Sequence, residues 1–287
     1  MTLSAPSPDL YCVMGNPVEH SRSPWIHTRF AELTGQALRY ERRLVPLDGF
    51  AQALHDFAQA GGRGCNITVP FKLEAAQAAT VRSERVLLAG AANTLSWVDG
   101  RLHADNTDGL GLVADLEQGA GFTLAGRDVL LVGAGGAAAG ALGPLLAAGP
   151  RRVVVANRTV VRAQALVQAH TALASLQKTE LLAQAPQALE HDFDLIINAT
   201  ASSLAGAEVP VPAQVLRAGS LAYDMMYGPA AEGFLGWARQ HGAEGRDGLG
   251  MLVEQAAEAF RIWRGVRPPS QQVLAELQAL MAAPAAH

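Results

Sequence analysis

The uncharged stretch Val129–Pro150 constrains the fold of this chain more than any other segment. Its length could span a bilayer. However, six glycines and Pro144 interrupt it, and the glycines begin directly after the apolar run Val129–Val132. Because glycines in such a position mark a turn, the order of residues favours a buried strand, a tight turn and a closely packed helix over a membrane span.

The glycines of this turn match a dinucleotide-binding pattern. Residues 133–138 read Gly-Ala-Gly-Gly-Ala-Ala, which is G-x-G-x-x-A placed directly after the predicted strand. Such glycines let the backbone turn tightly and approach a pyrophosphate, and the N-terminus of the following helix supplies N–H donors. A buried Gly/Ala-rich helix would explain the composition but not this placement. We therefore predict a diphosphate loop made of Gly133, Ala134, Gly135, Gly136 and Ala137.

A carboxylate is missing where an NAD site usually has one. In NAD-preferring sites the next strand ends in Asp or Glu, which binds the ribose 2′-hydroxyl. Here Arg158 stands in that region and offers a planar cation for a 2′-phosphate, with Arg162 one helical turn further on. Arg158 could also be a solvated arginine at a helix start. The segment favours NADP(H), and its candidate residues are Asn157, Arg158, Thr159 and Arg162.

Composition excludes several classes of protein. The 287 residues are 49% hydrophobic and 17% charged, which suits folded domains rather than disorder. The formal net charge is −4 and the pI is about 6.1, so neither nucleic acid nor an anionic membrane is indicated as a partner. Cys12 and Cys65 are expected to be reduced, buried thiols. The first residues lack a basic segment followed by an apolar run, so we expect a cytoplasmic protein.

Apolar strands and helical stretches alternate twice along the chain. The first series starts at Leu10–Gly15 and ends in a hairpin whose turn is Asp99-Gly100, and the second starts at Val129. Such alternation predicts βαβ units and mainly parallel sheets. We expect an α/β fold with two domains. These are a substrate-binding domain at 1–108, on which helices within 250–287 pack back, and a Rossmann-type nucleotide-binding domain at 109–249.

Two segments of the first domain place polar groups at predicted helix starts. Ser23 before Pro24 fits an N-cap and first-turn pair, but Ser21 and Ser23 could also seat a carboxylate. Lys72 falls in the first turn of a helix that begins at Pro70. A cation there opposes the helix dipole at a cost of about 0.3–1 kcal/mol, so Lys72 is either a solvent-facing lysine or a functional one.

Further polar candidates follow along the chain. Asn93 and Asp108 flank the predicted hairpin and so are expected to lie close together. Asp108 either caps the helix that follows it or pairs with Lys72. Met225, after a strand, either packs on a nicotinamide ring or fills the core. Gln255, on an otherwise apolar helix, needs a partner if it is buried, and a bound polyol would provide one.

Taken in order, these motifs resemble the NADP-dependent shikimate dehydrogenase family, whose members reduce 3-dehydroshikimate to shikimate in aromatic amino acid biosynthesis. The resemblance extends from Gly15 to about Gly265. It implies that hydroxyl groups hold the shikimate carboxylate, and that other polar side chains contact the ring and its hydroxyls. The implied carboxylate residues are Ser21 and Ser23, and the others are Thr68, Lys72, Asn93, Asp108, Tyr227 and Gln255. On the cofactor side the resemblance adds Glu84, Met225 and Gly248.

The chain departs from the family pattern at positions that hold no substrate candidate. The family's Asn-Ala-Thr-Ser-Ser-Gly stretch reads Asn-Ala-Thr-Ala-Ser-Ser here, at residues 198–203. A frequent arginine after the glycine loop is Ala139. These changes could adjust the grip on the cofactor or domain closure.

The resemblance implies hydride transfer to a carbonyl carbon, which leaves an alkoxide that needs a proton and stabilisation. We expect Lys72 to donate the proton and Asp108 to orient Lys72, in a cleft between the domains that closes to exclude water. The eight histidines are scattered and no Cys/His cluster occurs, so no metal is expected.

Other functions stay open. A quinate/shikimate dehydrogenase would also accept quinate, although Arg158 argues against NAD as its cofactor. A non-catalytic ligand sensor could keep the fold but would have no need of Lys72 and Asp108. A folate or amino-acid dehydrogenase could share the nucleotide domain without the paired serines. The expected partners are shikimate and 3-dehydroshikimate rather than nucleic acid or a membrane, and a homodimer is left open.

Overall fold

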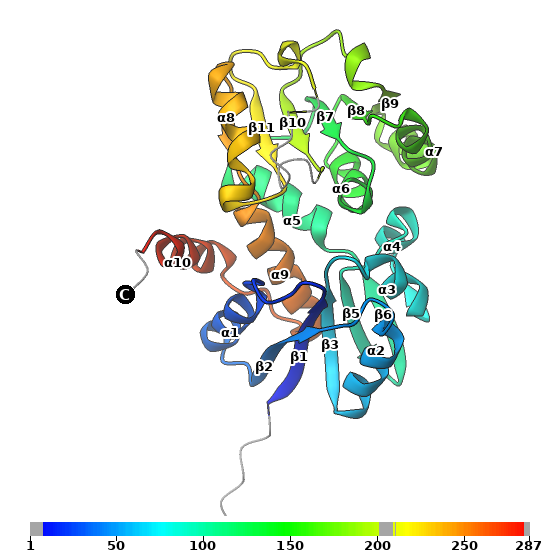
Figure 1. Cartoon of the computed structure of the whole chain (residues 1–287), viewed down its shortest axis with the longest axis vertical. Helices are drawn as coiled ribbons and strands as arrows, with labels where there is room; N and C mark the ends of the chain where they lie inside the picture. Colours follow the sequence, from blue (N-terminus) through cyan, green and yellow to red (C-terminus); the bar gives the residue numbers. More distant parts are fainter. Residues whose placement is uncertain (1–7, 201–208, 210, 284–287) are drawn as a thin grey trace, which may run out of the picture. The chain divides into compact units, whose positions relative to one another are not determined.

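The computed structural model describes residues 8–200, 209 and 211–283. The chain divides into two compact units, whose elements are labelled in Figure 1. The first unit consists of Met1–Thr107 and Val253–His287, and the second consists of Asp108–Leu252. Each unit is built on a six-stranded sheet.

The sheet of the first unit has the strand order β2-β1-β3-β5-β6-β4. Strand β1 pairs in parallel with β2 and β3, whereas β5 pairs antiparallel with β3 and β6. Asp99 and Gly100 join β5 to β6 with φ angles of 50° and 73°, as a tight hairpin turn requires, so the predicted hairpin is confirmed. The strands are β1 (Asp9–Gly15), β2 (Leu38–Leu44), β3 (Gly62–Ile67), β4 (Val81–Arg82), β5 (Thr94–Val98) and β6 (Arg101–Asp105).

Helices of the first unit pack on this sheet and on one another. Helix α1 contacts β2 and α10, and α2 contacts β3. Apolar side chains of β1, β3, α2 and α3 form a core that includes Met14, Phe57 and Phe71. The helices are α1 (Ser23–Thr34), α2 (Phe50–Gln59), α3 (Lys72–Ala78), α4 (Glu84–Ala89), α10 (Ser270–Ala282) and α9 (Leu249–Arg264), whose first turn belongs to the second unit.

The sheet of the second unit is parallel throughout, in the order β12-β11-β10-β7-β8-β9. Val129 and Leu131 of β7 enter the core on one face of the sheet. Leu130 and Val132 enter the core on the other face, so burial on both faces accounts for the continuous apolar run. The strands are β7 (Asp128–Val132), β8 (Arg152–Ala156), β9 (Glu180–Gln184), β10 (Leu195–Asn198), β11 (Leu221–Asp224) and β12 (Glu244–Arg246).

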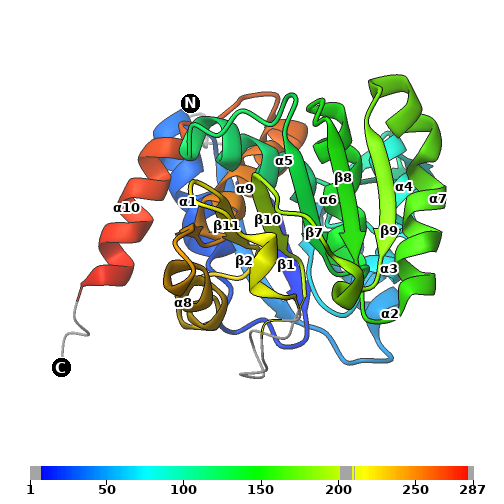
Figure 2. The ribbon, with the colours of Figure 1, turned by 90° about the horizontal axis from the view of Figure 1, so that it is seen from above.

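The central strand β7 lies between β8 and β10, so the order in which the chain adds strands reverses there. In open α/β sheets, ligands bind at the carboxyl ends of the strands beside this reversal. Figure 2 shows α7 running alongside β9 at the edge of the sheet. The α-helices of this unit are α5 (Asp108–Ala114), α6 (Gly136–Ala147), α7 (Val160–Gln177) and α8 (Glu232–Gln240).

A π-helical turn, η1 (Asp115–Gly119), follows α5 and contains a fully buried carboxylate. Arg246 of β12 donates to both oxygens of Asp115, from Nε at 2.9 Å and from Nη2 at 2.5 Å. The Tyr223 hydroxyl of β11 donates to Asp115 Oδ2 at 2.8 Å. These charge-assisted bonds tie the turn to two strands of the sheet.

The structure corrects several predicted boundaries. Helix α1 begins at Ser23, after an N-cap residue, Arg22, that makes no side-chain cap bond, so the predicted Ser23 cap is wrong. Asp108 is the first residue of α5 and does not precede that helix as a cap. The sequence pattern predicts a helix over residues 159–170, but helix α7 continues two turns beyond His170, to Gln177. Strand β9 was not predicted because its residues are only half-buried at the sheet edge and lack alternation.

A buried histidine lies in an aromatic cluster of the first unit. The His27 ring stacks on Tyr40, with centroids 4.3 Å apart and planes 3° apart, and the rings of Phe260 and Trp263 lie within 6.3 Å. Within the described ranges, neither ring nitrogen has a hydrogen-bond partner. Burial lowers the pKa of His27 from 6.5 to about 3, and the nearby Asn66 side chain offsets only part of this effect.

This lowered pKa predicts a loss of stability below neutral pH. Between about pH 6.5 and 3 the imidazole of the unfolded chain binds a proton that the folded chain excludes. Above pH 6.5 the titration of His27 therefore costs no stability. Below pH 6.5 it lowers the free energy of unfolding by about 1.4 kcal/mol per pH unit. Burial also lowers the pKa of His170, which adds a loss of the same sign.

Urea denaturation at pH 7.5, 6.5 and 5.5 measures this loss. We expect His27→Phe, which keeps an aromatic ring but cannot titrate, to show a shallower fall in the free energy of unfolding than the parent protein. The control is His55→Gln, at an exposed position of α2, which should leave the slope unchanged. An unchanged slope in His27→Phe would contradict the prediction.

Candidate active site

The glycine loop follows β7 and forms the start of α6. Gly133 has φ +116°, donates from its N–H to Ala156 O at 2.8 Å, and leaves no room for a side chain, since a Cβ would lie 3.1 Å from Ala199 O. Gly135 and Gly136 differ, because no atom lies within 4 Å of the position of a Cβ. Both are exposed, and Gly135 gives α6 no side-chain cap. The exposed backbone N–H groups fit a diphosphate that approaches the main chain closely.

The end of β8 presents the cationic part of this site. Asn157 Nδ2 donates to Thr159 O at 2.9 Å and so shapes the turn into α7. Arg158 within this turn and Arg162 in the first turn of α7 are exposed. With no carboxylate in the turn, these side chains fit the 2′-phosphate of NADP(H).

Two loops at the carboxyl ends of β11 and β12 are locked together. Gly248 N–H donates to Met226 O at 2.8 Å, and a Cβ on Gly248 would lie 2.4 Å from Met225 O. Asp247 accepts from the N–H of Gly228 and of Leu249, at 3.0 and 3.1 Å. This packing keeps the two cofactor candidates Met225 and Gly248 side by side.

The paired serines lie where the chain enters α1. Ser23 is buried and donates from its backbone N–H to Ser21 Oγ at 3.3 Å. Arg42 of β2 donates to Ser21 O from Nη2 at 2.7 Å and from Nε at 3.1 Å. Thr68, after β3, donates its backbone N–H to Met14 O of β1 at 2.9 Å. These segments gather at the carboxyl ends of β1 and β3.

Asn93 connects most of the remaining substrate candidates of the first unit. The neighbouring Ala92 N–H donates to Lys72 O at 2.8 Å, which ties the start of α3 to the start of β5. Asn93 Oδ1 accepts the N–H of Thr107 at 2.8 Å, and Asn93 Nδ2 donates to Gln255 Oε1 at 3.3 Å. Asn93 thus contacts the residue that precedes Asp108, while the predicted proximity of Asn93 to Asp108 itself stays a prediction.

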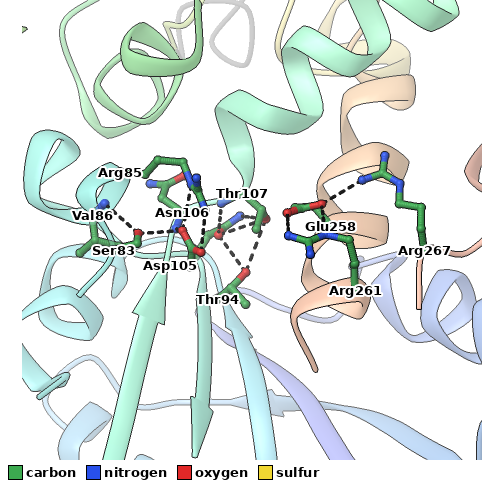
Figure 3. A network of polar contacts seen from close by, with 11 residues as sticks. Ser83, Arg85, Val86, Thr94, Asp105, Asn106, Thr107, Glu258, Arg261 and Arg267 are labelled. Carbon is green, nitrogen blue, oxygen red and sulfur yellow. Dashed lines mark hydrogen bonds and ion pairs between the residues drawn. The ribbon is translucent and has the colours of Figure 1, made fainter. Parts of the chain in front are cut away.

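Asp105 holds the turn that leads to Asp108, as Figure 3 shows. Its carboxylate accepts from Arg85 Nε and Nη2 at 3.0 and 2.7 Å, from Ser83 Oγ at 2.8 Å and from the N–H of Asn106 at 2.7 Å. The predictions omitted Arg85 and Asp105. The sequence signal for Asp105 is the segment Asp-Asn-Thr-Asp at 105–108, whose pattern points to Asp108 only through its place at a helix start.

The candidates are distributed over both units. Among the substrate candidates, Asp108 and Tyr227 belong to the second unit and the others to the first. Among the cofactor candidates, the exposed Glu84 at the start of α4 belongs to the first unit and the others to the second. That these residues meet in one site, and that Lys72 pairs with Asp108, stays a prediction.

Neither a metal centre nor a membrane span is found in the described part of the chain. There, no group of three or more His, Cys, Asp or Glu side chains is arranged to hold a metal ion. No helix in the same residues has the length and apolarity to cross a membrane. Cys12 and Cys65 are free thiols buried in the core.

Comparisons with known proteins decide the family. The shikimate dehydrogenase substrate binding domain matches residues 13–95, the "Shikimate / quinate 5-dehydrogenase" family matches 115–209, and the shikimate 5'-dehydrogenase C-terminal domain matches 248–278. The shikimate dehydrogenase (NADP(+)) of Acidovorax sp. (strain JS42) is 77% identical over 96% of this chain and 98% of its own length. The chain belongs to the shikimate dehydrogenase family.

Solved structures share the fold. The crystal structure of an Ael1 enzyme from Pseudomonas putida is 46% identical, with a TM-score of 0.87 over 94% of this chain and 98% of that one. The shikimate 5-dehydrogenase from Thermus thermophilus, in complex with NADP(H) and shikimate, is 33% identical with a TM-score of 0.81, over 94% of this chain and 99% of its own. Family membership confirms the predicted two-domain α/β fold, the oxidoreductase class and the NADP(H) dependence.

Proposed function

We propose that this chain reversibly reduces 3-dehydroshikimate to shikimate with NADP(H). The observation that carries the proposal is the position of Asn93, whose hydrogen bonds join Thr107, next to Asp108, to Gln255 on α9. The backbone N–H of Ala92 donates to the backbone oxygen of Lys72, the first residue of α3. The side-chain pair of Asn93 and Gln255 and the backbones at Lys72 and Thr107 therefore lie around one buried residue, which supports recognition of a polyhydroxylated acid here.

The residues of the second unit suit NADP(H), which supplies a hydride when it is bound. The loop from Gly133 to Ala137 would hold the diphosphate, and Arg158 and Arg162 would hold the 2′-phosphate with Asn157 and Thr159. Met225 and Gly248 would line the nicotinamide side, with Glu84 as a further contact. The open backbone of Gly135 and Gly136 supports this assignment.

Lys72 acts as the general acid in the direction of reduction. As the carbonyl oxygen gains negative charge, the ammonium group donates a hydrogen bond and then its proton to that oxygen. Asp108 accepts a hydrogen bond from the ammonium group and orients it toward the substrate. In the direction of oxidation, neutral Lys72 takes the proton from the substrate hydroxyl.

The remaining candidates recognise the substrate. Ser21 and Ser23 donate hydrogen bonds from their hydroxyls to the substrate carboxylate. Thr68, Asn93, Tyr227 and Gln255 contact the ring hydroxyls through groups that can donate or accept. Quinate is a second candidate substrate, because the family that matches 115–209 is described as acting on shikimate or quinate. A cytoplasmic location and a homodimer also belong to this proposal, and size-exclusion chromatography with light scattering tests the homodimer.

Replacing Lys72 tests the mechanism. We expect Lys72→Ala to lower kcat about 10²–10⁴-fold, the usual contribution of general acid–base catalysis, while the Kd of NADP+ changes less than twofold. Stopped-flow or steady-state absorbance of the reduced cofactor gives kcat, and calorimetry gives the Kd. The only other lysine supplies a matched control, since Lys178→Ala in the second unit should keep parental kcat. Parental turnover by Lys72→Ala would remove Lys72 from the mechanism.

Replacing Arg158 tests the assignment of the cofactor. Loss of a charge-assisted hydrogen bond costs about 1.5–3 kcal/mol, so Arg158→Ala should raise the KM for NADP+ about 10–100-fold. NAD+ lacks the 2′-phosphate, and its KM should change less than twofold in the same variant. Initial rates with shikimate and each cofactor provide both values. An equal rise for the two cofactors would show that Arg158 does not read the phosphate.

A further inference from the structure

Tyr40, on β2, is not among the residues assigned so far. It is hydrogen-bonded to Asn66, whose side chain reaches the assigned residue Asn93. Its side chain is buried, and its hydroxyl donates to Asn66 Oδ1 at 2.7 Å. The stacked His27 ring fixes the plane of the Tyr40 ring. Burial raises the pKa of Tyr40 well above its ordinary value, and the neighbouring Ser23 side chain opposes this rise. Tyr40 thus stays protonated, as a donor that lies between Ser23 and Asn66.

A backbone carbonyl fixes the orientation of the Asn66 amide. Asn66 Nδ2 donates to Asn93 O and to Thr94 Oγ1, both at 3.2 Å. A carbonyl oxygen only accepts, so the NH₂ group of Asn66 must face Asn93 and its Oδ1 must face Tyr40. The Tyr40 hydroxyl is therefore the donor in its bond to Asn66, and it supplies the buried Asn66 Oδ1 with a hydrogen-bond donor.

A backbone N–H fixes the other end of the same network. Thr107 N–H only donates, so the atom of Asn93 that faces it must be Oδ1. Thr94 Oγ1 accepts from Asn66, which directs the Thr94 hydroxyl proton to Asn93 Oδ1 at 2.9 Å. Asn93 Nδ2 then donates to Thr107 Oγ1 at 3.0 Å and to Gln255 Oε1 at 3.3 Å. The hydrogen bonds therefore run in one direction from Tyr40 to Gln255.

We propose that Tyr40 is a positioning residue for the substrate, because its hydroxyl holds the Asn66 amide in place, and Asn66 in turn supports Thr94 and the Asn93 amide that contacts Gln255. The proposal rests on the proposed function, since it takes Asn93 and Gln255 as contacts of shikimate. Without the hydroxyl, Asn66 Oδ1 is buried with no donor, and Asn66 shifts to reach one. Its NH₂ group then moves away from Asn93 O and Thr94 Oγ1, and the Asn93 and Gln255 side chains are held less firmly where they meet the substrate.

Tyr40→Phe removes the hydroxyl and keeps the ring that stacks on His27. We expect the Kd of shikimate, measured by calorimetry, and its KM to rise about tenfold, the equivalent of about 1.4 kcal/mol. The Kd of NADP+ should change less than twofold. This split between the two ligands separates positioning from a general loss of stability.

Tyr11→Phe is the matched control. Tyr11 is the register partner of Tyr40 on the neighbouring strand and is equally buried. Its ring packs on Trp263, and its hydroxyl interacts with Arg264 instead of Asn66. The same chemical change there should alter the Kd of shikimate less than twofold. A rise in Tyr40→Phe no larger than that in Tyr11→Phe would overturn the proposal.

A double-mutant cycle tests the route through Asn66. If Tyr40 acts through that side chain, adding Tyr40→Phe to Asn66→Ala should change the Kd of shikimate less than twofold, whereas independent effects would multiply and contradict the proposal. Should Tyr40→Phe fail to fold, Thr94→Val interrupts the same network and should raise the Kd of shikimate about as much, with Thr94→Ser restoring it. Parental protein that does not bind shikimate at all would instead overturn the proposed function.

Discussion

The hydrogen bonds of one buried asparagine, Asn93, hold together the segments of the first unit that carry the proposed substrate contacts. Its backbone N–H donates to Asp105 O and its backbone oxygen accepts from Ile67 N–H, so the residue joins β3 to β6 just before β5 begins. Its side chain reaches Thr107 and Gln255. An unmade bond at such a depth costs about 1–3 kcal/mol, so the groups around Asn93 have little freedom to rearrange.

Charge reinforces this arrangement at its outer side. Asp105 receives donors from the start of α4 and from the turn at 106, while Asn106 Nδ2 donates to Ala91 O at 3.0 Å. The loop at residues 105–107 is therefore held both by the buried amides of Asn93 and Asn106 and by the partly exposed ion pair of Arg85 with Asp105. Backbone donors and acceptors, which cannot exchange roles, determine the polarity of the side-chain amides of Asn66, Asn93 and Asn106.

Local sequence signals were sufficient for the fold and for part of the site. Gly133 after β7 and the Asp99-Gly100 turn require particular backbone conformations, so the strand, helix and hairpin around them could be predicted. Lys72 stood out because a cation at a helix start opposes the dipole.

The rest of the site could not be predicted from local signals. Tyr40 and Arg85 act through partners 26 and 20 residues away, and nothing in their own neighbourhoods distinguishes them from an ordinary core tyrosine or a surface arginine. The element boundaries that were wrong, at Ser23 and at His170, depend on tertiary packing that extends or shifts a helix beyond its local cap signals.

The buried carboxylate of Asp115 has a consequence for how this sequence can diverge. A Cβ on Gly250 would lie 1.9 Å from Asp115 Oδ1. The carboxylate therefore fills the space that a side chain at position 250 would need, although the two residues are remote in the chain. The acid in turn neutralises Arg246, which would be costly to bury alone. Substitutions at positions 115, 246 and 250 are therefore expected to occur together. A smaller residue at 115 leaves room for a side chain at 250, and loss of the carboxylate requires replacement of Arg246 as well.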